Sequence, residues 1–181
     1  MQTVKSSILA LLACVATPAA AGTASPFDSY FGKVQDGPVC FGRTYDPAHL
    51  QNHPAQKVEI IEIDMTKDSA SGKPNTPESF ELGFALKVKG RADWYGQAAI
   101  CKTDGNAFSC FLEADGGLFR LTPEGDQGLK LETGDYGISI EGGADFVSLD
   151  GKSGDDKVFS LAKSHAECDA ASAFFKAGGE E

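Results

Sequence analysis

The chain lacks an excess of basic residues and lacks any apolar run long enough to span a bilayer. Only 16 Lys and Arg residues stand against 26 Asp and Glu in 181 residues, which gives a formal net charge of −10 at pH 7. Nucleic acids and anionic lipids bind positive surfaces, so neither is an expected partner. A transmembrane helix needs about 20 consecutive apolar residues, so we expect no transmembrane segment.

Several short catalytic and binding motifs are also missing. No C-x-x-C pair is present, which argues against zinc ribbons and thioredoxin-like redox sites. No G-x-S-x-G nucleophile turn occurs, and no phosphate-binding glycine loop precedes a helix. With 26 acidic residues a catalytic carboxylate pair is always conceivable, so a small secreted hydrolase stays an alternative function.

The first 21 residues have the organisation of a secretory signal peptide. Lys5 supplies the positive charge, Ser6–Val15 is a short apolar stretch, and small residues precede a cleavage position after Ala21. We therefore predict a periplasmic or secreted protein. The alternative is a bacterial lipobox ending at Cys14, which would be acylated and would anchor the protein to the outer membrane.

Four cysteines remain in the predicted mature domain, residues 22–181. An even number of cysteines in an exported chain indicates disulfides, and four cysteines allow three pairings. A four-residue loop at 104–107 would place Cys101 directly opposite Cys110 in a β-hairpin, which suits disulfide geometry. Cys40 and Cys168 would then join the two ends of the domain.

Alternating apolar and polar residues predict many short β-strands. Phe80–Val88 alternates without a break, and Gln56 to Met65 alternates with one irregularity at Ile60 and Ile61 that suggests a β-bulge. Helix signals occur at residues 46–54 and 163–176, and the aromatic spacing of Phe27, Tyr30 and Phe31 suggests one helical turn laid against the core. We predict a mainly β fold of about nine strands, either an antiparallel meander barrel or a two-sheet sandwich, with a short helix in the N-terminal half and a C-terminal helix.

An apolar–polar–apolar triplet recurs in the second half of the chain. It starts at Phe119, Leu129, Ile138, Val147 and Phe159, and Gly/Asp clusters separate the copies. We interpret each triplet as a separate strand with its two apolar residues buried and its central residue exposed. Consecutive triplets would then run in opposite directions.

One of these Gly/Asp clusters resembles a repeat of the calcium-binding nonapeptide proteins. Residues 149–158 read LDGKSGDDKV, and Asp156 stands where that family has a calcium ligand. The resemblance implies a parallel β-roll with metal-filled turns. The alternative is an ordinary acidic hairpin turn in an antiparallel sheet.

His49 and His53 are the candidate metal ligands. Asp46 is a plausible N-cap for a short helix that ends before Pro54, and the two histidines share one face of that helix. A third ligand would have to be His165, from the far end of the chain. No other cofactor is expected. A periplasmic metal-handling protein is therefore a second alternative function.

Aromatic residues offer one further kind of site. Trp94, Tyr95, Phe80, Phe84 and Phe108 could line a ligand cavity inside a wide barrel, and the competing interpretation is ordinary core packing.

The stretch CFGRTYDPAHLQNHP, residues 40–54, resembles exported proteins of Gram-negative bacteria, and the resemblance implies no particular activity. Small disulfide-stabilised barrels serve elsewhere as carriers and as inhibitors of secreted hydrolases. We therefore expect a non-enzymatic exported β-domain that binds a small molecule or another protein.

Overall fold

The computed structural model describes residues 24–33, 39–65, 69, 72–142, 145–150, 154–164 and 168–177. The predicted signal peptide and Cys14 lie outside the described residues, and so does His165. Among the described residues, no helix combines the length and the apolar character that crossing a bilayer requires.

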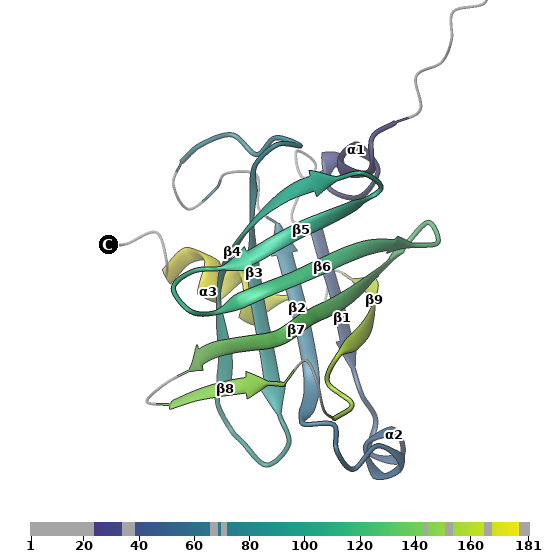
Figure 1. The fold of residues 1–181 in the computed structure, drawn as a ribbon, viewed down its shortest axis with the longest axis vertical. Helices are drawn as coiled ribbons and strands as arrows, with labels where there is room; N and C mark the ends of the chain where they lie inside the picture. The colour runs from purple at the N-terminus through teal and green to yellow at the C-terminus, as the bar shows by residue number, and fades with distance from the viewer. Residues whose placement is uncertain are drawn as a thin grey trace, which may run out of the picture.

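Antiparallel strands form one sheet that closes on itself as a barrel (Figure 1). The strands are β1 (Val39–Thr44), β2 (Val58–Met65), β3 (Phe80–Val88), β4 (Trp94–Asp104), β5 (Ala107–Leu112), β6 (Gly117–Glu124), β7 (Gly128–Gly142), β8 (Asp145–Leu149) and β9 (Val158–Ser164). β6 pairs with β7, and β9 pairs with both β7 and β1, so eight strands complete the circuit. The prediction of a mainly β barrel is confirmed.

The strand order is a meander for the first seven strands. β1 to β7 are neighbours in chain order, whereas β9 lies between β7 and β1. β8 is an extra strand that pairs with the second half of β7, outside the closed barrel. The two halves of β7 thus pair with different strands, the first with β9 and the second with β8.

This arrangement corrects one prediction about the triplets. Leu129–Leu131 and Ile138–Ile140 belong to the same strand, β7, and do not run in opposite directions. The glycine-rich cluster between them bulges out of the strand and does not reverse it, because four residues, 134–137, face the single residue Leu118 of β6. Gly137 has φ +71°, a left-handed conformation that lets the extra residues leave the strand and return to it.

The inward and outward assignments of the triplets are confirmed. All ten flanking apolar side chains are buried, namely Phe119, Leu121, Leu129, Leu131, Ile138, Ile140, Val147, Leu149, Phe159 and Leu161. The five central residues are exposed or half-buried. Because every strand pair in the described part of the chain is antiparallel, the fold is not the parallel roll of the nonapeptide proteins.

The β4–β5 hairpin carries the first disulfide. Cys101 lies opposite Cys110, and their Cα atoms are 4.1 Å apart. The predicted facing of Thr103 and Phe108 is also present. The loop is shorter than predicted, because Asp104 and Ala107 themselves pair and leave a two-residue turn at 105–106.

Three short helices accompany the barrel, and the first of them coincides with the helical turn suggested by the spacing of Phe27, Tyr30 and Phe31. They are α1 (Pro26–Tyr30), α2 (Pro47–Asn52) and α3 (Asp169–Ala177). α2 begins as expected, with the Asp46 carboxylate accepting a hydrogen bond from the His49 amide at 2.8 Å. The C-terminal helix begins later than predicted, because Lys163 and Ser164 continue β9 and pair with β1.

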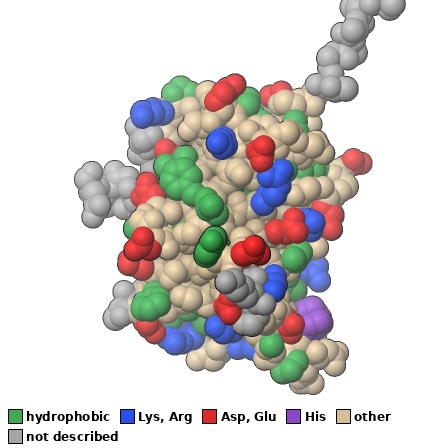
Figure 2. Space-filling view, in the orientation of Figure 1, with side chains coloured by type: hydrophobic (Ala, Val, Ile, Leu, Met, Phe, Trp, Pro, Cys, Tyr) green, Lys and Arg blue, Asp and Glu red, His purple; other side chains and the backbone are tan. Residues whose placement is uncertain are grey.

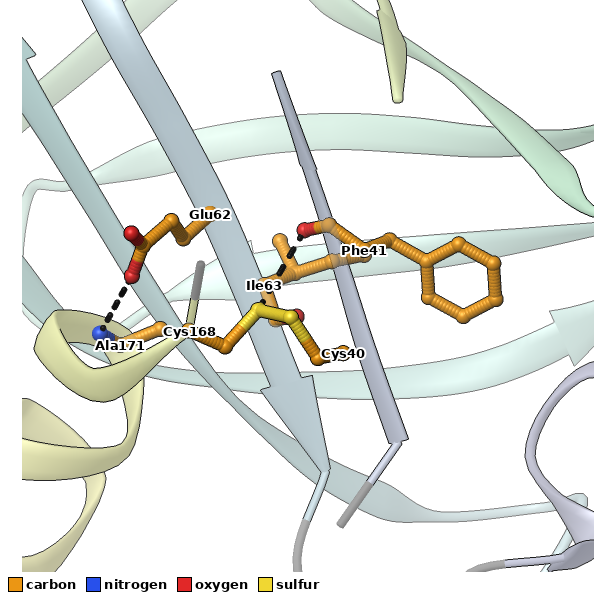
Figure 3. The surroundings of a disulfide bond; sticks show 6 residues. All are labelled: Cys40, Phe41, Glu62, Ile63, Cys168 and Ala171. Carbon is orange, nitrogen blue, oxygen red and sulfur yellow. Dashed lines mark hydrogen bonds between the residues drawn. A yellow bond between two sulfur atoms is a disulfide. The ribbon is translucent and has the colours of Figure 1, made fainter. Parts of the chain in front are cut away.

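α3 covers the outer face of β2, β3 and β4. The Cys40–Cys168 disulfide, with 5.7 Å between the Cα atoms, joins β1 to the residue before α3 (Figure 3). The Ala171 amide donates a hydrogen bond of 3.3 Å to the Glu62 carboxylate on β2, so the helix end is held at two points. Gly96 makes room for the helix, because a Cβ there would lie 2.5 Å from the Phe174 ring.

Candidate binding surfaces

The barrel interior is filled with aromatic side chains. The ring of Phe31, which follows α1, lies 5.1 Å from that of Phe108 and 5.2 Å from that of Phe80. Phe84 packs against Phe119 at 5.3 Å. These rings are almost completely buried, so they form core and not the lining of an open cavity. Binding surfaces therefore have to be sought on the outside and at the ends of the barrel.

The outer face of β4, β5 and β6 carries an apolar groove of about 420 Å³. Ile100, Phe111 and Leu118 lie in line across it, because Ile100 is paired with Phe111 and Phe111 with Leu118 on adjacent strands. Phe111 is 45% exposed and Leu118 is 62% exposed. Lys102 and Glu78 supply charges of both signs to the lining.

Tyr136 extends this line beyond the groove. It belongs to the β7 bulge that faces Leu118, and it is 96% exposed. Figure 2 shows hydrophobic side chains gathered over β5 and β6, with a further one below them over β7. We call the outward row of Ile100, Phe111, Leu118 and Tyr136 the apolar row.

The apolar row was not predicted from the sequence, although the alternation of inward and outward residues along β5 and β6 predicts part of it. Cys110 and Phe119 point inward, so their neighbours Phe111 and Leu118 must point outward. The alignment of the row depends on the pairing of β5 with β6, which local sequence does not specify. The position of Tyr136 depends on the bulge in β7. The sequence pattern of this glycine-rich segment predicts a turn that reverses the chain.

The two candidate metal ligands lie in a stack of rings at α2. The Tyr45 and His49 rings are 4.6 Å apart, and the His49 and His53 rings are 4.3 Å apart with planes inclined by 19°. His49 Nε2 lies 3.0 Å from Gln56 Oε1, and His53 Nδ1 lies 3.6 Å from an Asp155 carboxylate oxygen. The structure thus brings His49 and His53 together in a stacked arrangement.

Stacking is a poor starting point for chelation. The metal-binding lone pairs of an imidazole lie in the ring plane, so those of two nearly parallel rings do not converge on one ion. Within the described residues, no group of three or more His, Cys, Asp or Glu side chains is placed to hold a metal. Zinc binding by His49 and His53 stays a prediction, and calorimetry of the parent chain and of His49→Ala is its test.

Asp156, the residue singled out by the nonapeptide resemblance, has a structural role. Its carboxylate accepts hydrogen bonds from the backbone amides of Lys57 and Val58, at 2.6 and 3.0 Å. It therefore fastens the loop before β9 to the start of β2, across one end of the barrel. Burial raises the pKa of this carboxyl, and the two amide donors oppose that shift.

A second cavity, of about 380 Å³, opens at the same end of the barrel, between β8 and the adjoining ends of β2 and β3. Lys57 donates a hydrogen bond of 3.2 Å to the Ser148 carbonyl oxygen on β8. Arg91, in the turn after β3, forms an ion pair of 2.5 Å with Asp145, the first residue of β8. These two side chains tie the extra strand to the barrel on either side of the cavity, which we call the mouth cavity.

Neither cavity holds a pair of carboxylates that could support hydrolysis. Glu78 is the acidic residue that lines the outer groove, and Lys57, Lys89 and Arg91 are the charged residues that line the mouth cavity. Within the described residues these two cavities therefore do not supply the carboxylate pair of a hydrolase, and the hydrolase alternative stays a prediction. Comparison with known proteins gives no further guide, since no family model, curated protein or solved structure matches the chain significantly.

Proposed function

We propose that this chain is an exported, non-enzymatic binding protein that docks onto another protein through the apolar row. The observation that carries the proposal is the outward row of the half-buried Ile100 and the exposed Phe111, Leu118 and Tyr136, on a barrel wall that no helix covers among the described residues. Contiguous exposed apolar surface rimmed by polar residues is typical of interaction sites. Aromatic residues such as Phe111 and Tyr136 are common anchors in such interfaces.

The groove favours a protein partner with a protruding apolar side chain. A volume of about 420 Å³ between Ile100, Phe111 and Leu118 is large enough for a bulky side chain to be buried in it. Lys102, Ser109 and Glu78 around it offer polar contacts for a rim.

Charge indicates the nature of that partner. The chain carries a formal net charge of −10, so a second copy would be repelled at long range and a basic protein would be attracted. We therefore propose a basic exported protein as the partner. Export of the chain itself is supported by the two disulfides, which form and persist in oxidising compartments.

Site-specific photo-crosslinking tests this function. A photoreactive phenylalanine analogue in place of Ser109, inside the groove, should crosslink a basic protein in cell-envelope extract of the source cells. Leu118→Asp should abolish the crosslink, because it places a charge where an apolar contact is expected. The matched control is Phe146→Asp, since Phe146 on β8 is 61% exposed against 62% for Leu118 and lies outside the groove.

Three results would contradict the proposal. A crosslink only to a second copy of the chain would identify the apolar row as a homodimer interface. A crosslinked protein that persists in Leu118→Asp, or the lack of any crosslink from Ser109 with the folded protein, would remove the apolar row from partner binding.

A further inference from the structure

The mouth cavity collects positive charge on an acidic protein. Acidic residues outnumber Lys and Arg by 26 to 16 in the chain, yet the charged residues lining this cavity are Lys57, Lys89 and Arg91. They come from the start of β2 and from the segment after β3, so the fold and not a local sequence run assembles them. None of these residues lines the groove of the apolar row.

The carboxylates nearest to these cations are already engaged. Asp145 is paired with Arg91, whose guanidinium also donates a hydrogen bond of 3.1 Å to the Tyr95 hydroxyl. Asp156 accepts hydrogen bonds from backbone amides through both carboxylate oxygens, and its negative charge also acts on Lys57 and Lys89. Two ammonium groups stand against this single carboxylate, so a net positive charge remains at Lys57 and Lys89.

Lys57 and Lys89 keep donors to spare. The hydrogen bonds of their ammonium groups go to backbone carbonyl oxygens, of Ser148 at 3.2 Å and of Pro54 at 3.4 Å. Neither ammonium group has a carboxylate within 4.0 Å among the described residues. Each ammonium group has three N–H donors, so each retains two for a ligand.

The rest of the lining is mixed. Pro54 and the 61% exposed ring of Phe146 offer apolar surface, Gln56 and Ser148 are polar, and Val88 and Val147 are almost completely buried. A cavity that combines apolar surface with a few polar groups suits a small molecule, and about 380 Å³ is within the usual range of volumes. The ammonium groups select for negative charge, and the apolar residues select for a hydrocarbon or aromatic body.

We propose that the mouth cavity binds a small amphiphilic carboxylate, with its carboxylate between Lys57 and Lys89 and its apolar body against the exposed ring of Phe146. This site is separate from the apolar row and does not depend on it. β8, held by Lys57 and by the Arg91–Asp145 ion pair, forms one wall of the site.

Calorimetry and NMR titration of the folded mature chain with octanoate test this proposal. We expect saturable binding, with amide shifts concentrated at Phe146, Ser148 and Val88. Octanamide, the uncharged analogue, should bind at least about tenfold more weakly because it cannot pair with the ammonium groups. Inorganic phosphate, which has no apolar body, should also bind more weakly than octanoate.

Charge-removing variants locate the site. Lys57→Met and Lys89→Met should each weaken octanoate binding about tenfold, and Lys57→Arg should retain most of it. Lys87→Met is the matched control, because Lys87 is on the same strand as Val88 but outside the cavity lining. If loss of the Lys57–Ser148 contact unfolds β8, Lys89→Met carries the test by itself, since Lys89 bonds to the loop before β2 and not to β8.

Four outcomes would overturn the proposal. They are the lack of octanoate binding at millimolar concentration, equal affinity for octanamide, phosphate binding as tight as octanoate binding, and a loss in Lys87→Met as large as in Lys89→Met.

Discussion

The barrel has two kinds of wall, and they differ in what covers them. On β2, β3 and β4 the outer face is packed under α3, and the residues there are small or buried, such as Ala85, Gly96 and Glu62. On β5, β6 and the bulge of β7 the outer face carries Phe111, Leu118 and Tyr136 without a covering helix among the described residues. We refer to these as the covered wall and the open wall.

The difference shows that the size of the outward-facing side chains on a strand indicates whether a helix packs over it. A helix can approach a sheet closely only where the sheet side chains are small, which is why a Cβ at Gly96 would collide with the Phe174 ring. Large apolar side chains on the open wall leave no such space for a helix. Exposed apolar surface of this kind is typical of a site that a partner protein buries. The open wall is therefore better suited to an external protein than to a helix of the same chain.

The largest expected effect comes from releasing α3. Cys40→Ala with Cys168→Ala should lower the free energy of unfolding by about 2–5 kcal/mol, because this bridge spans 128 residues and holds the covered wall closed. Urea denaturation gives the loss, and hydrogen exchange should show α3 opening first. Removing the Cys101–Cys110 bridge, which spans only 9 residues, should cost less. Equal losses in the free energy of unfolding for the two bridges would contradict a particular role of the Cys40–Cys168 bridge in holding α3 on the covered wall.

A smaller loss is expected from filling the space under α3. Gly96→Val should cost about 1–3 kcal/mol, because its side chain would have to displace the Phe174 ring or the Phe84 carbonyl oxygen. Gly134→Val on the open wall is the control, and it should change stability by less than about 0.5 kcal/mol because the nearest atom to a Cβ there is 3.6 Å away. Thermal unfolding of both variants measures the contrast, and similar losses would deny that the two walls differ in packing.

Substitution of the apolar row itself should hardly change folding. Leu118→Asp is expected to alter the free energy of unfolding by less than about 0.5 kcal/mol, because its side chain is 62% exposed. Chemical denaturation of the isolated protein measures this change. A loss well above 1 kcal/mol would show that Leu118 already packs within the chain, and the open wall would then need no partner.

The smallest effect concerns an ion pair on the open wall. Arg120 on β6 contacts Asp104 at 2.5 Å, and the hydrogen bond from its guanidinium lowers the pKa of that carboxyl. A carboxyl whose pKa is lowered by folding contributes stability above its ordinary pKa of about 3.9, and this contribution is lost as the pH falls through the lowered value. Arg120→Gln should return the Asp104 pKa to its ordinary range, with little change in stability because the pair is solvent-exposed.

NMR titration of the Asp104 carboxyl in both proteins measures this change. An unchanged pKa in Arg120→Gln would show that the contact is not maintained in solution.

Local patterns in the sequence predicted the elements that depend on neighbouring residues. The alternation of Phe80–Val88, the cap at Asp46, the register of the Cys101–Cys110 hairpin and the inward faces of the triplets all follow from contacts within or next to one strand or turn. The later start of α3 was missed because Lys163 and Ser164 are held by pairing with β1, far away in the chain. The bulge at 134–137 was read as a turn because glycine-rich clusters suit both.

The candidate sites were much less accessible from the sequence. His49 and His53 were correctly placed on one short helix, but the stacking of their rings and their contacts with Gln56 and Asp155 were not predicted. The mouth cavity was not recognised at all, since Lys57, Lys89 and Phe146 are distant in sequence and belong to three different strand ends.

The sequence by itself determined the mainly β character, the disulfide pairing and which side of each strand faces the core, because these depend on period-two alternation and on short-range spacing. Tertiary structure decided the closure of the barrel, the insertion of β9 between β7 and β1, and the covering of one wall by α3 while another stays open. These features arise from pairing between strands far apart in the chain, and no local pattern specifies the partner of a strand edge. Both proposed binding surfaces belong to this second group.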